Sequence, residues 1–260
     1  MTEKKYFLTF ANKSYMSTER LHGEVKRMNI FDKIIQANED YIVSYIQKHI
    51  RFIKRHRPGF GFWIWKPKII FDTLNKIEEN DVLMYCDAGM YANEKGKDRF
   101  YYYIEQLKEK DMVVFSTNKN FKSQMWVKND AIMEYYPDFN NQLNNYCYAG
   151  IMIIKKTQKT LDLIRDWLSL CQNYHFLNKN PSFKHKENPI YIGNDCDNGL
   201  FNLCLAKHNI HFTVEPDEIN IYTNEGKQIA HENIDHRSVD WSSLENIPFQ
   251  CRRMTPKFGF

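Results

Sequence analysis

Residues 81–89 read Asp-Val-Leu-Met-Tyr-Cys-Asp-Ala-Gly, an apolar run that ends in a carboxylate and a glycine. A short apolar run between polar residues is typical of a fully buried strand. A second run of this kind covers residues 150–154, and residues 160–171 after it have the spacing of an amphipathic helix. The two runs therefore predict buried strands at the centre of the fold.

Further strands and helices are predicted on either side of these runs. The predicted strands cover residues 6–10, 30–35, 112–115 and 210–214, and the predicted helices cover residues 21–28, 42–50, 69–77, 100–107 and 198–208. Such alternation favours an α/β fold with a mainly parallel central sheet flanked by helices. We expect a mobile loop at residues 175–189 and irregular structure in the last forty residues. No repeat or linker divides the chain, so we expect one domain over residues 1–260.

Composition places the chain among ordinary globular proteins. Of its 260 residues 43% are apolar and 26% are charged, which excludes disordered and coiled-coil classes. Lys and Arg total 36 and Asp and Glu total 32, and the resulting charge of +4 is too small to argue for wholesale nucleic-acid binding. No apolar stretch approaches the ~20 residues of a membrane span, and no signal peptide is recognisable. We therefore expect a cytoplasmic protein.

Cysteine and aromatic residues add two expectations. The six cysteines form no Cys-x-x-Cys pair and lie mostly among apolar neighbours, so they are predicted to be reduced core thiols rather than disulfides. Aromatic residues make up 15% of the chain, enough both to fill a core and to offer flat surfaces to a base or a sugar.

Asp87 is the first candidate functional residue. In open α/β sheets ligands bind beyond the carboxyl ends of the strands, and Asp87 stands at such an end. It could meet a ligand or a metal there. The alternative is a turn that ends the strand, for which Asp and Gly are both favoured.

Residues 59–67, Gly-Phe-Gly-Phe-Trp-Ile-Trp-Lys-Pro, form the densest aromatic segment. The spacing is not that of a P-loop. In an extended segment Trp63 and Trp65 would face one side and Lys66 the other. The segment is either the wall of a binding site or an aromatic cluster beneath a loop, with Lys66 in solvent.

Two further groups of polar residues are candidates. Asp195 and Asp197 precede a predicted helix, where one of them could be the N-cap and the other could serve as a general base. His231 and His236 lie in the run His-Glu-Asn-Ile-Asp-His-Arg, which is either a metal-binding segment or a solvated loop and lacks the His-Glu-x-x-His spacing.

Four stretches together resemble a group of GT-A glycosyltransferases found in bacterial surface-polysaccharide clusters and some large viruses. Residues 57–70 match a Gly-aromatic-Gly-aromatic-Trp-x-Trp-Lys-Pro signature, and residues 81–89 match a strand that ends in Asp-Ala-Gly. Residues 148–167 match an Ala-Gly strand followed by Lys-Lys-Thr and a helix with a Trp, and residues 197–203 resemble the acceptor-side stretch. Residues 6–32 show a weaker resemblance to the same group. Gly89 stands where many GT-A enzymes have a second carboxylate.

The resemblance implies a single GT-A-like (Rossmann-like) domain, with a nucleotide-sugar-binding half at 1–115 and an acceptor-binding half with the C-terminal tail at 116–260. The implied donor-binding residues are Thr9, Ala11, Trp63, Trp65, Lys66, Asp87 and Gly89. The implied metal ligands are Asp87 with His231 or His236, which suit manganese or magnesium. The implied catalytic residues are Asp197, as base or acceptor-positioning group, and Asp195 as its alternative.

The function expected from this resemblance is transfer of a hexose-like sugar from a nucleotide-diphosphate sugar, most simply a UDP-sugar, to a hydroxyl of a glycan or lipid-linked glycan. Polysaccharide or lipopolysaccharide assembly at the inner face of a membrane would suit it. Two alternatives stay open, a nucleotidyl- or phosphosugar-processing α/β enzyme and a carbohydrate-binding module without catalysis. Release of free nucleoside diphosphate separates the module from the transferase.

Overall fold

The computed structural model describes residues 3–13, 17–117, 121–141, 145–211, 214, 218–219 and 244–251. The strands are β1 (Lys5–Phe10), β2 (Lys33–Ala37), β3 (Val82–Cys86), β4 (Tyr91–Ala92), β5 (Met112–Ser116), β6 (Cys147–Lys155) and β7 (Phe249–Gln250). The helices are α1 (Ser17–Met28), α2 (Val43–Arg55), α3 (Gly59–Phe62), α4 (Lys66–Leu74), α5 (Lys97–Gln106), α6 (Asn129–Tyr135), α7 (Gln158–Gln172), α8 (Tyr174–Leu177) and α9 (Cys196–Lys207). Single 3₁₀ turns cover Glu39–Ile42, Glu94–Gly96, Ser123–Met125 and Pro137–Asn141.

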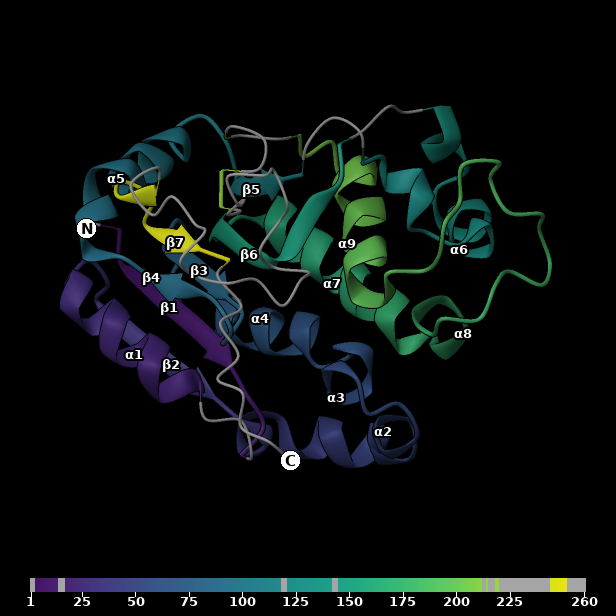
Figure 1. The fold of residues 1–260 in the computed structure, drawn as a ribbon, viewed down its shortest axis with the longest axis horizontal. Helices are drawn as coiled ribbons and strands as arrows, with labels where there is room; N and C mark the ends of the chain where they lie inside the picture. The colour runs from purple at the N-terminus through teal and green to yellow at the C-terminus, as the bar shows by residue number, and fades with distance from the viewer. Residues whose placement is uncertain are drawn as a thin grey trace, which may run out of the picture.

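A five-stranded sheet in the order β2-β1-β3-β6-β5 forms the centre of the molecule (Figure 1). β1 is parallel to β2 and β3, and β6 is antiparallel to both of its neighbours, β3 and β5. Four strands thus point the same way and β6 alone among the five is reversed. The predicted α/β fold with a mainly parallel sheet flanked by helices is confirmed. β4 and β7 form a separate antiparallel pair.

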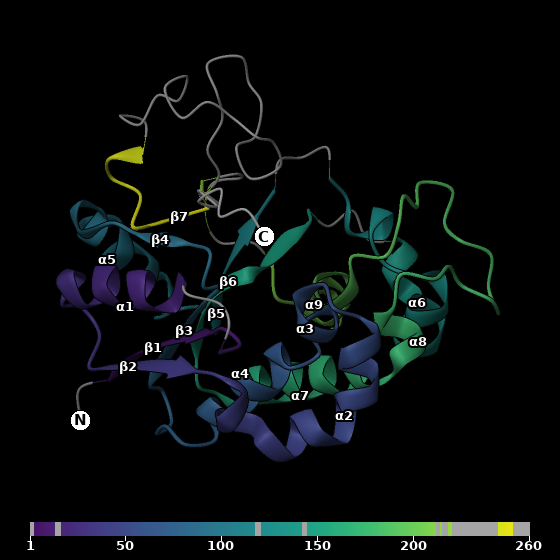
Figure 2. The ribbon, with the colours of Figure 1, turned by 60° about the horizontal axis from the view of Figure 1, so that its bottom comes forward.

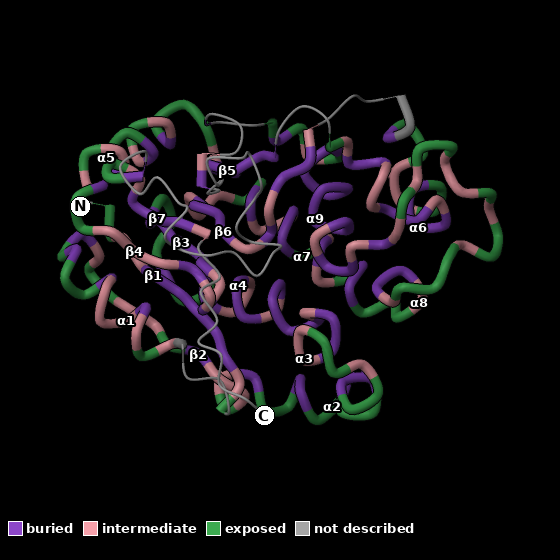
Figure 3. The backbone as a smooth tube through the Cα atoms, viewed as in Figure 1, coloured by how far each residue is buried: buried purple, intermediate pink, exposed green. Residues whose placement is uncertain are grey.

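Helices cover both faces of this sheet. Because successive side chains of a strand point to opposite faces, Phe7 and Met84 belong to an apolar cluster with residues of α1 and α5. Leu8 and Tyr85 belong to a second cluster with residues of α2, α4, α7 and α9. Figure 2 shows the sheet between these two layers. α9 is buried along nearly its whole length (Figure 3).

The ends of several predicted elements differ from the structure. β2 begins at Lys33, three residues later than predicted. The predicted strand at 210–214 is wrong for its described residues, because the Ile210 N–H donates to the Leu205 carbonyl (2.9 Å) and closes the end of α9. This closure follows Asn209, whose φ of +53° turns the chain back on the helix.

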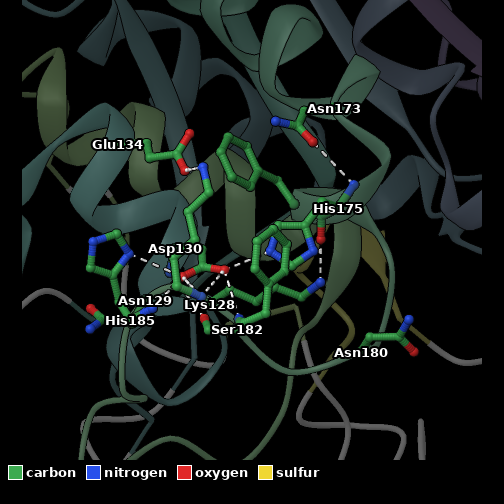
Figure 4. Close-up of polar contacts among 12 residues, drawn as sticks. Lys128, Asn129, Asp130, Glu134, Asn173, His175, Asn180, Ser182 and His185 are labelled. Carbon is green, nitrogen blue, oxygen red and sulfur yellow. Dashed lines mark hydrogen bonds and ion pairs between the residues drawn. The ribbon is translucent and has the colours of Figure 1, made fainter.

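The segment expected to be a mobile loop, residues 175–189, includes the end of α8 and a loop anchored on α6 (Figure 4). The fully buried Asp130 carboxylate accepts the backbone N–H groups of Phe183, Lys184 and His185 at 2.9, 3.2 and 2.8 Å. The same carboxylate is hydrogen-bonded to ring nitrogens of His175 (2.7 Å) and His185 (3.0 Å). Burial alone would raise the pKa of Asp130, but these bonds outweigh it and hold that pKa far below its usual range. A carboxylate on α6 therefore fixes the loop.

Candidate functional site

The site begins at the edge where β1 and β3 end. Leu8 pairs with Tyr85 in the parallel register, so the carboxyl ends of both strands meet there, and Asp87 follows β3 directly. The Asp87 N–H donates to the Gly150 carbonyl at 2.7 Å, and the Tyr85 hydroxyl donates to Asp87 Oδ1 at 2.5 Å. One third of the Asp87 side chain is exposed (33%), so this carboxylate can meet a ligand.

A left-handed backbone turn leads to the second component of the site. Gly59, Phe60, Gly61, Phe62 and Trp63 all have positive φ, at +60°, +54°, +89°, +53° and +58°. Left-handed geometry costs about 1–2 kcal/mol per non-glycine residue, and such strain persists where surrounding contacts impose it. A Cβ on Gly59 would lie 2.3 Å from the Trp63 ring, and one on Gly61 would lie 2.7 Å from a side chain of α2. The two glycines are therefore required by this turn.

Lys66 is the second component, and it is buried. α4 begins at Lys66, with Pro67 in its first turn, and the Lys66 side chain is only 4% exposed. Its ammonium lies 3.3 Å from Asp87 Oδ1 and 3.3 Å from Asp197 Oδ2. Burial alone would lower the pKa of Lys66, but the two carboxylates outweigh burial and raise it. The alternative of a solvated Lys66 is wrong, and so is the extended geometry expected for residues 59–67.

Asp197, the third component, comes from the first turn of α9. The Trp167 indole N–H donates to its backbone carbonyl at 2.8 Å and ties this turn to α7. The carboxylate is 3% exposed, and among the described residues its Oδ2 has no hydrogen-bond partner beyond the long ion pair with Lys66. Burial raises the pKa of Asp197 to about 7; Lys66 opposes this shift, and Asp195 and Asp87 add to it. Its environment therefore favours the protonated form of Asp197 more than solvent does.

Asp195 lies next to this group in a separate polar network. Its Oδ2 accepts the Tyr146 hydroxyl and the Asn198 amide (3.0 Å). Burial and the Asp195 charge raise the pKa of Tyr146 well above its usual value. Asp195 occupies the N-cap position of α9, yet its side chain makes no cap hydrogen bond, and Asp197 lies inside the helix. Neither carboxylate caps α9 through its side chain.

The other predicted donor-binding residues lie around this centre with different exposure. Trp63 is half-buried, and its ring centroid is 5.8 Å from Lys66 Nζ. Trp65 is buried in the core, where it stacks on a ring of β1 at 3.9 Å, so it can only brace the site. Thr9 is fully buried and its hydroxyl has no partner among the described residues, and Ala11 is also buried. Gly89 is half-exposed, in the turn after Asp87.

The predicted metal ligands are only partly placed. His231 and His236 lie outside the described residues. Within the part of the chain that the structure describes, no three His, Cys, Asp or Glu side chains are arranged to hold a metal ion. Oδ1 of Asp87 already receives the Tyr85 hydroxyl and faces the Lys66 ammonium. The described residues alone therefore do not form a binding site for a divalent cation.

Sequence reasoning missed Tyr85, Tyr146 and Gly150. A Cβ on Gly150 would lie 2.8 Å from Asp87 Oδ2, so this glycine of β6 makes room for the carboxylate. Its signal is present in the Ala-Gly pair that precedes the other apolar residues of the predicted strand, in the stretch at 148–167. Tyr85 gives no such signal because it is one more residue of an apolar strand, and Tyr146 gives none because its partner Asp195 is far away in the sequence.

The six cysteines are all free thiols, as predicted. Five of them are buried, and burial raises the pKa of the Cys147 and Cys196 thiols to about 12. No helix within the described residues is both long and apolar enough to cross a membrane.

Comparisons with known proteins find no matching family model and no matching curated protein. Among solved structures, the chain is similar to apo mouse xyloside xylosyltransferase 1, with 9% identity over 97% of this chain and 100% of that one and a TM-score of 0.45. It is similar to the apo glycosyltransferase GlyE of Streptococcus pneumoniae (12% identity, 83% and 46% covered, TM-score 0.42). It is also similar to the apo bifunctional glycosyltransferase WbbM (10%, 96% and 46%, TM-score 0.49). The chain thus spans about half the length of GlyE and WbbM, and similarity at TM-scores below 0.5 assigns no function to it.

Proposed function

We propose that this chain is a GT-A-type glycosyltransferase that moves one hexose-like sugar from a nucleotide-diphosphate sugar to a hydroxyl of a glycan or lipid-linked glycan. The observation that carries this proposal is the buried Lys66 ammonium between Asp87 and Asp197, at the ligand-binding edge of the sheet. These residues belong to the stretches that resemble the family. A UDP-sugar is the first donor to test, and surface-polysaccharide or lipopolysaccharide assembly is the proposed setting.

The charges of the site suit an anionic donor. A buried ammonium interacts with a phosphate more strongly than one in water, because the local dielectric is low. Burial, Asp195 and Asp87 raise the pKa of Asp197, and protonation of Asp197 lowers the negative charge that a diphosphate meets beside Lys66. Lys66 then offsets the charge that develops on the leaving nucleoside diphosphate, a role for which a fixed, desolvated charge is effective.

We assign different roles to the two acceptor-side carboxylates. A general base must come within hydrogen-bonding distance of the proton that it removes. Asp195 is half-exposed and can meet an acceptor hydroxyl, so we propose it as the base. Asp197 is nearly fully buried behind Lys66, so we propose that it acts through Lys66, by holding the ammonium in place.

The proposed halves of the domain contribute separate parts of this site. Lys66 and Asp87 come from the donor half at 1–115, and Asp195 and Asp197 come from the acceptor half at 116–260. The ion pair of Lys66 with Asp197 joins the two halves at the proposed reacting centre, where Lys66 also pairs with Asp87 of its own half.

A panel of nucleotide sugars tests the proposal. Each donor is added with a mixture of glycan acceptors, with manganese, with magnesium or with EDTA, and free nucleoside diphosphate and glycosylated product are measured. The transferase predicts both products for at least one donor, and loss of turnover in EDTA would assign a divalent cation to the site. Thermal stabilisation by a glycan without nucleoside diphosphate release would instead support a carbohydrate-binding module. Release of pyrophosphate would support a nucleotidyl-processing enzyme.

A further inference from the structure

The turn that follows Asp87 is held from outside the site by helix α1. Residues 88–92 run from Asp87 to the end of β4. The Met90 N–H closes the turn on the Asp87 carbonyl at 2.9 Å. The direction of the Asp87 side chain depends on the path of this turn, because the residue is one third exposed and lies beyond the end of β3.

Arg20 of α1 binds two carbonyls of this turn. Its Nη2 donates to the Met90 carbonyl at 2.8 Å and to the Ala88 carbonyl at 3.3 Å. The guanidinium carbon also lies 3.6 Å from the centre of the Tyr91 ring, which is cation–π geometry. One side chain of α1 thus contacts three of the four residues at 88–91.

Glu24, one helical turn further along α1, completes the attachment. Its Oε2 accepts Arg20 Nη1 at 2.8 Å and the Ala92 N–H at 2.9 Å. The Glu24 side chain is only 12% exposed and that of Arg20 is 30% exposed. An ion pair between residues four apart on a helix contributes about 0.3–0.5 kcal/mol by itself, whereas this pair also holds both ends of the turn.

The position of the carbonyls fixes the direction of one backbone donor. The C=O and N–H of a trans peptide point in opposite directions. Since the Ala88 carbonyl points toward Arg20, the Gly89 N–H points away from α1. α1 covers one face of the sheet, and α4 and α9, which carry Lys66 and Asp197, lie on the other (Figure 2). No described residue accepts a hydrogen bond from the Gly89 N–H.

We infer that Arg20 and Glu24 are positioning residues that hold the 88–92 turn so that Asp87 stays paired with Lys66 and the Gly89 N–H faces a diphosphate bound beside that lysine. This inference rests on the proposed function. The Gly89 N–H supplies a hydrogen-bond donor to the phosphates. The absence of a side chain at Gly89 lets an anion approach the backbone closely.

The test compares Arg20→Ala, Arg20→Lys and Glu24→Gln with Lys26→Ala, which removes a positive charge from an exposed position of the same helix. Amide hydrogen exchange at residues 88–92 reports the turn, and calorimetry with UDP and inorganic pyrophosphate reports diphosphate binding. Arg20→Ala should speed exchange at 88–92 and weaken both ligands about tenfold or more, because the Gly89 N–H is no longer held toward the phosphates and its charge-assisted hydrogen bond to them is lost. Arg20→Lys, which keeps the charge and can reach one carbonyl, should recover part of both effects.

The outcomes separate this inference from the proposed function. Unchanged exchange at 88–92 in Arg20→Ala would overturn the role of Arg20 in holding the turn, whatever the protein catalyses. Equal weakening by Lys26→Ala would show that only long-range charge matters and would overturn positioning. Faster exchange with unchanged diphosphate affinity would overturn the role of the turn in binding. A wild-type protein that binds neither UDP nor pyrophosphate would overturn the inference together with the proposed donor site.

Discussion

Replacing Asp197 with asparagine removes a carboxylate whose pKa burial raises from 3.8 to about 7. Between these two pH values the folded protein holds a proton at Asp197 that the unfolded chain has lost. The free energy of unfolding contributed by this group therefore falls as pH rises from about 4 to about 7, and it stays at its low value above pH 7. Asparagine does not titrate, so the variant lacks this fall.

The size of this change in the free energy of unfolding follows from the pH range between the unfolded-state and folded-state pKa values of Asp197. One pKa unit corresponds to about 1.4 kcal/mol, so the two units between pH 5 and pH 7 give about 3 kcal/mol. At pH 5 Asp197 is protonated in the folded protein but ionised in the unfolded chain, so the variant with a neutral asparagine should already be more stable by about 1.6 kcal/mol. Between pH 5 and pH 8 the stability difference between the two proteins should grow by about 3 kcal/mol in favour of the variant.

Guanidinium unfolding curves at pH 5, 6, 7 and 8 measure this difference. Asp98→Asn is the matched control, because Asp98 is exposed on α5 and should show no such trend. Parallel stability profiles for wild type and Asp197→Asn would refute the reasoning, since they would mean that Lys66 keeps Asp197 ionised throughout this pH range.

Three further predictions concern the neighbours of Asp197. Lys66→Met leaves two carboxylates without their cation and should cost about 3–5 kcal/mol of unfolding free energy at pH 8, and less at pH 5, in the same denaturation assay; equal stability at pH 8 would contradict the buried ion pairs. Asp195→Asn should lower kcat by about 10²–10⁴ with a small fall in melting temperature, because an asparagine oxygen can still accept the Tyr146 hydroxyl; a near-normal kcat would exclude Asp195 as the base. Gly150→Ala places a Cβ 2.8 Å from Asp87 Oδ2 and should impair turnover, whereas Gly193→Ala, where nothing lies within 4 Å, should leave turnover unchanged.

Much of the sheet could be predicted because its strands are local apolar runs. β3 and β6 are buried on both faces, which makes their sequences continuous and easy to recognise. The strand expected at 210–214 fails for a different reason. Its residues fit a strand equally well, but the chain uses Ile210 to close the end of α9. Whether residues 210–214 form a strand or close a helix depends on how α9 ends, and the apolar pattern of these residues does not show that.

The position of Asp87 could be predicted, but the burial of Lys66 could not. A carboxylate that directly follows a buried parallel strand lies at the carboxyl edge of the sheet, which is the ligand-binding edge. Lys66 reaches the same edge only because residues 59–63 form a left-handed turn, and side-chain periodicity carries no information about the sign of φ. Two glycines in the segment permit this turn, yet the same pair would fit many loops.

The anchor of the 175–189 loop was also beyond local reasoning. The polar composition of this segment suggests mobility, but three of its backbone N–H groups converge on Asp130, 53 to 55 residues earlier in the chain. A buried carboxylate that accepts several hydrogen bonds looks the same in the sequence as an exposed one.

Turnover of Asp87→Asn tests the central claim, that the group around Lys66 is the donor site of a glycosyl transfer, most directly. The measurement is kcat/KM for nucleoside diphosphate release from the donor that wild type uses, with Asp98→Asn as the exposed control. Asp87→Asn leaves Lys66 paired with Asp197, so the account predicts a nearly unchanged melting temperature and loss of transfer, while the control keeps both. A stable Asp87→Asn variant with near-normal kcat/KM would contradict the account.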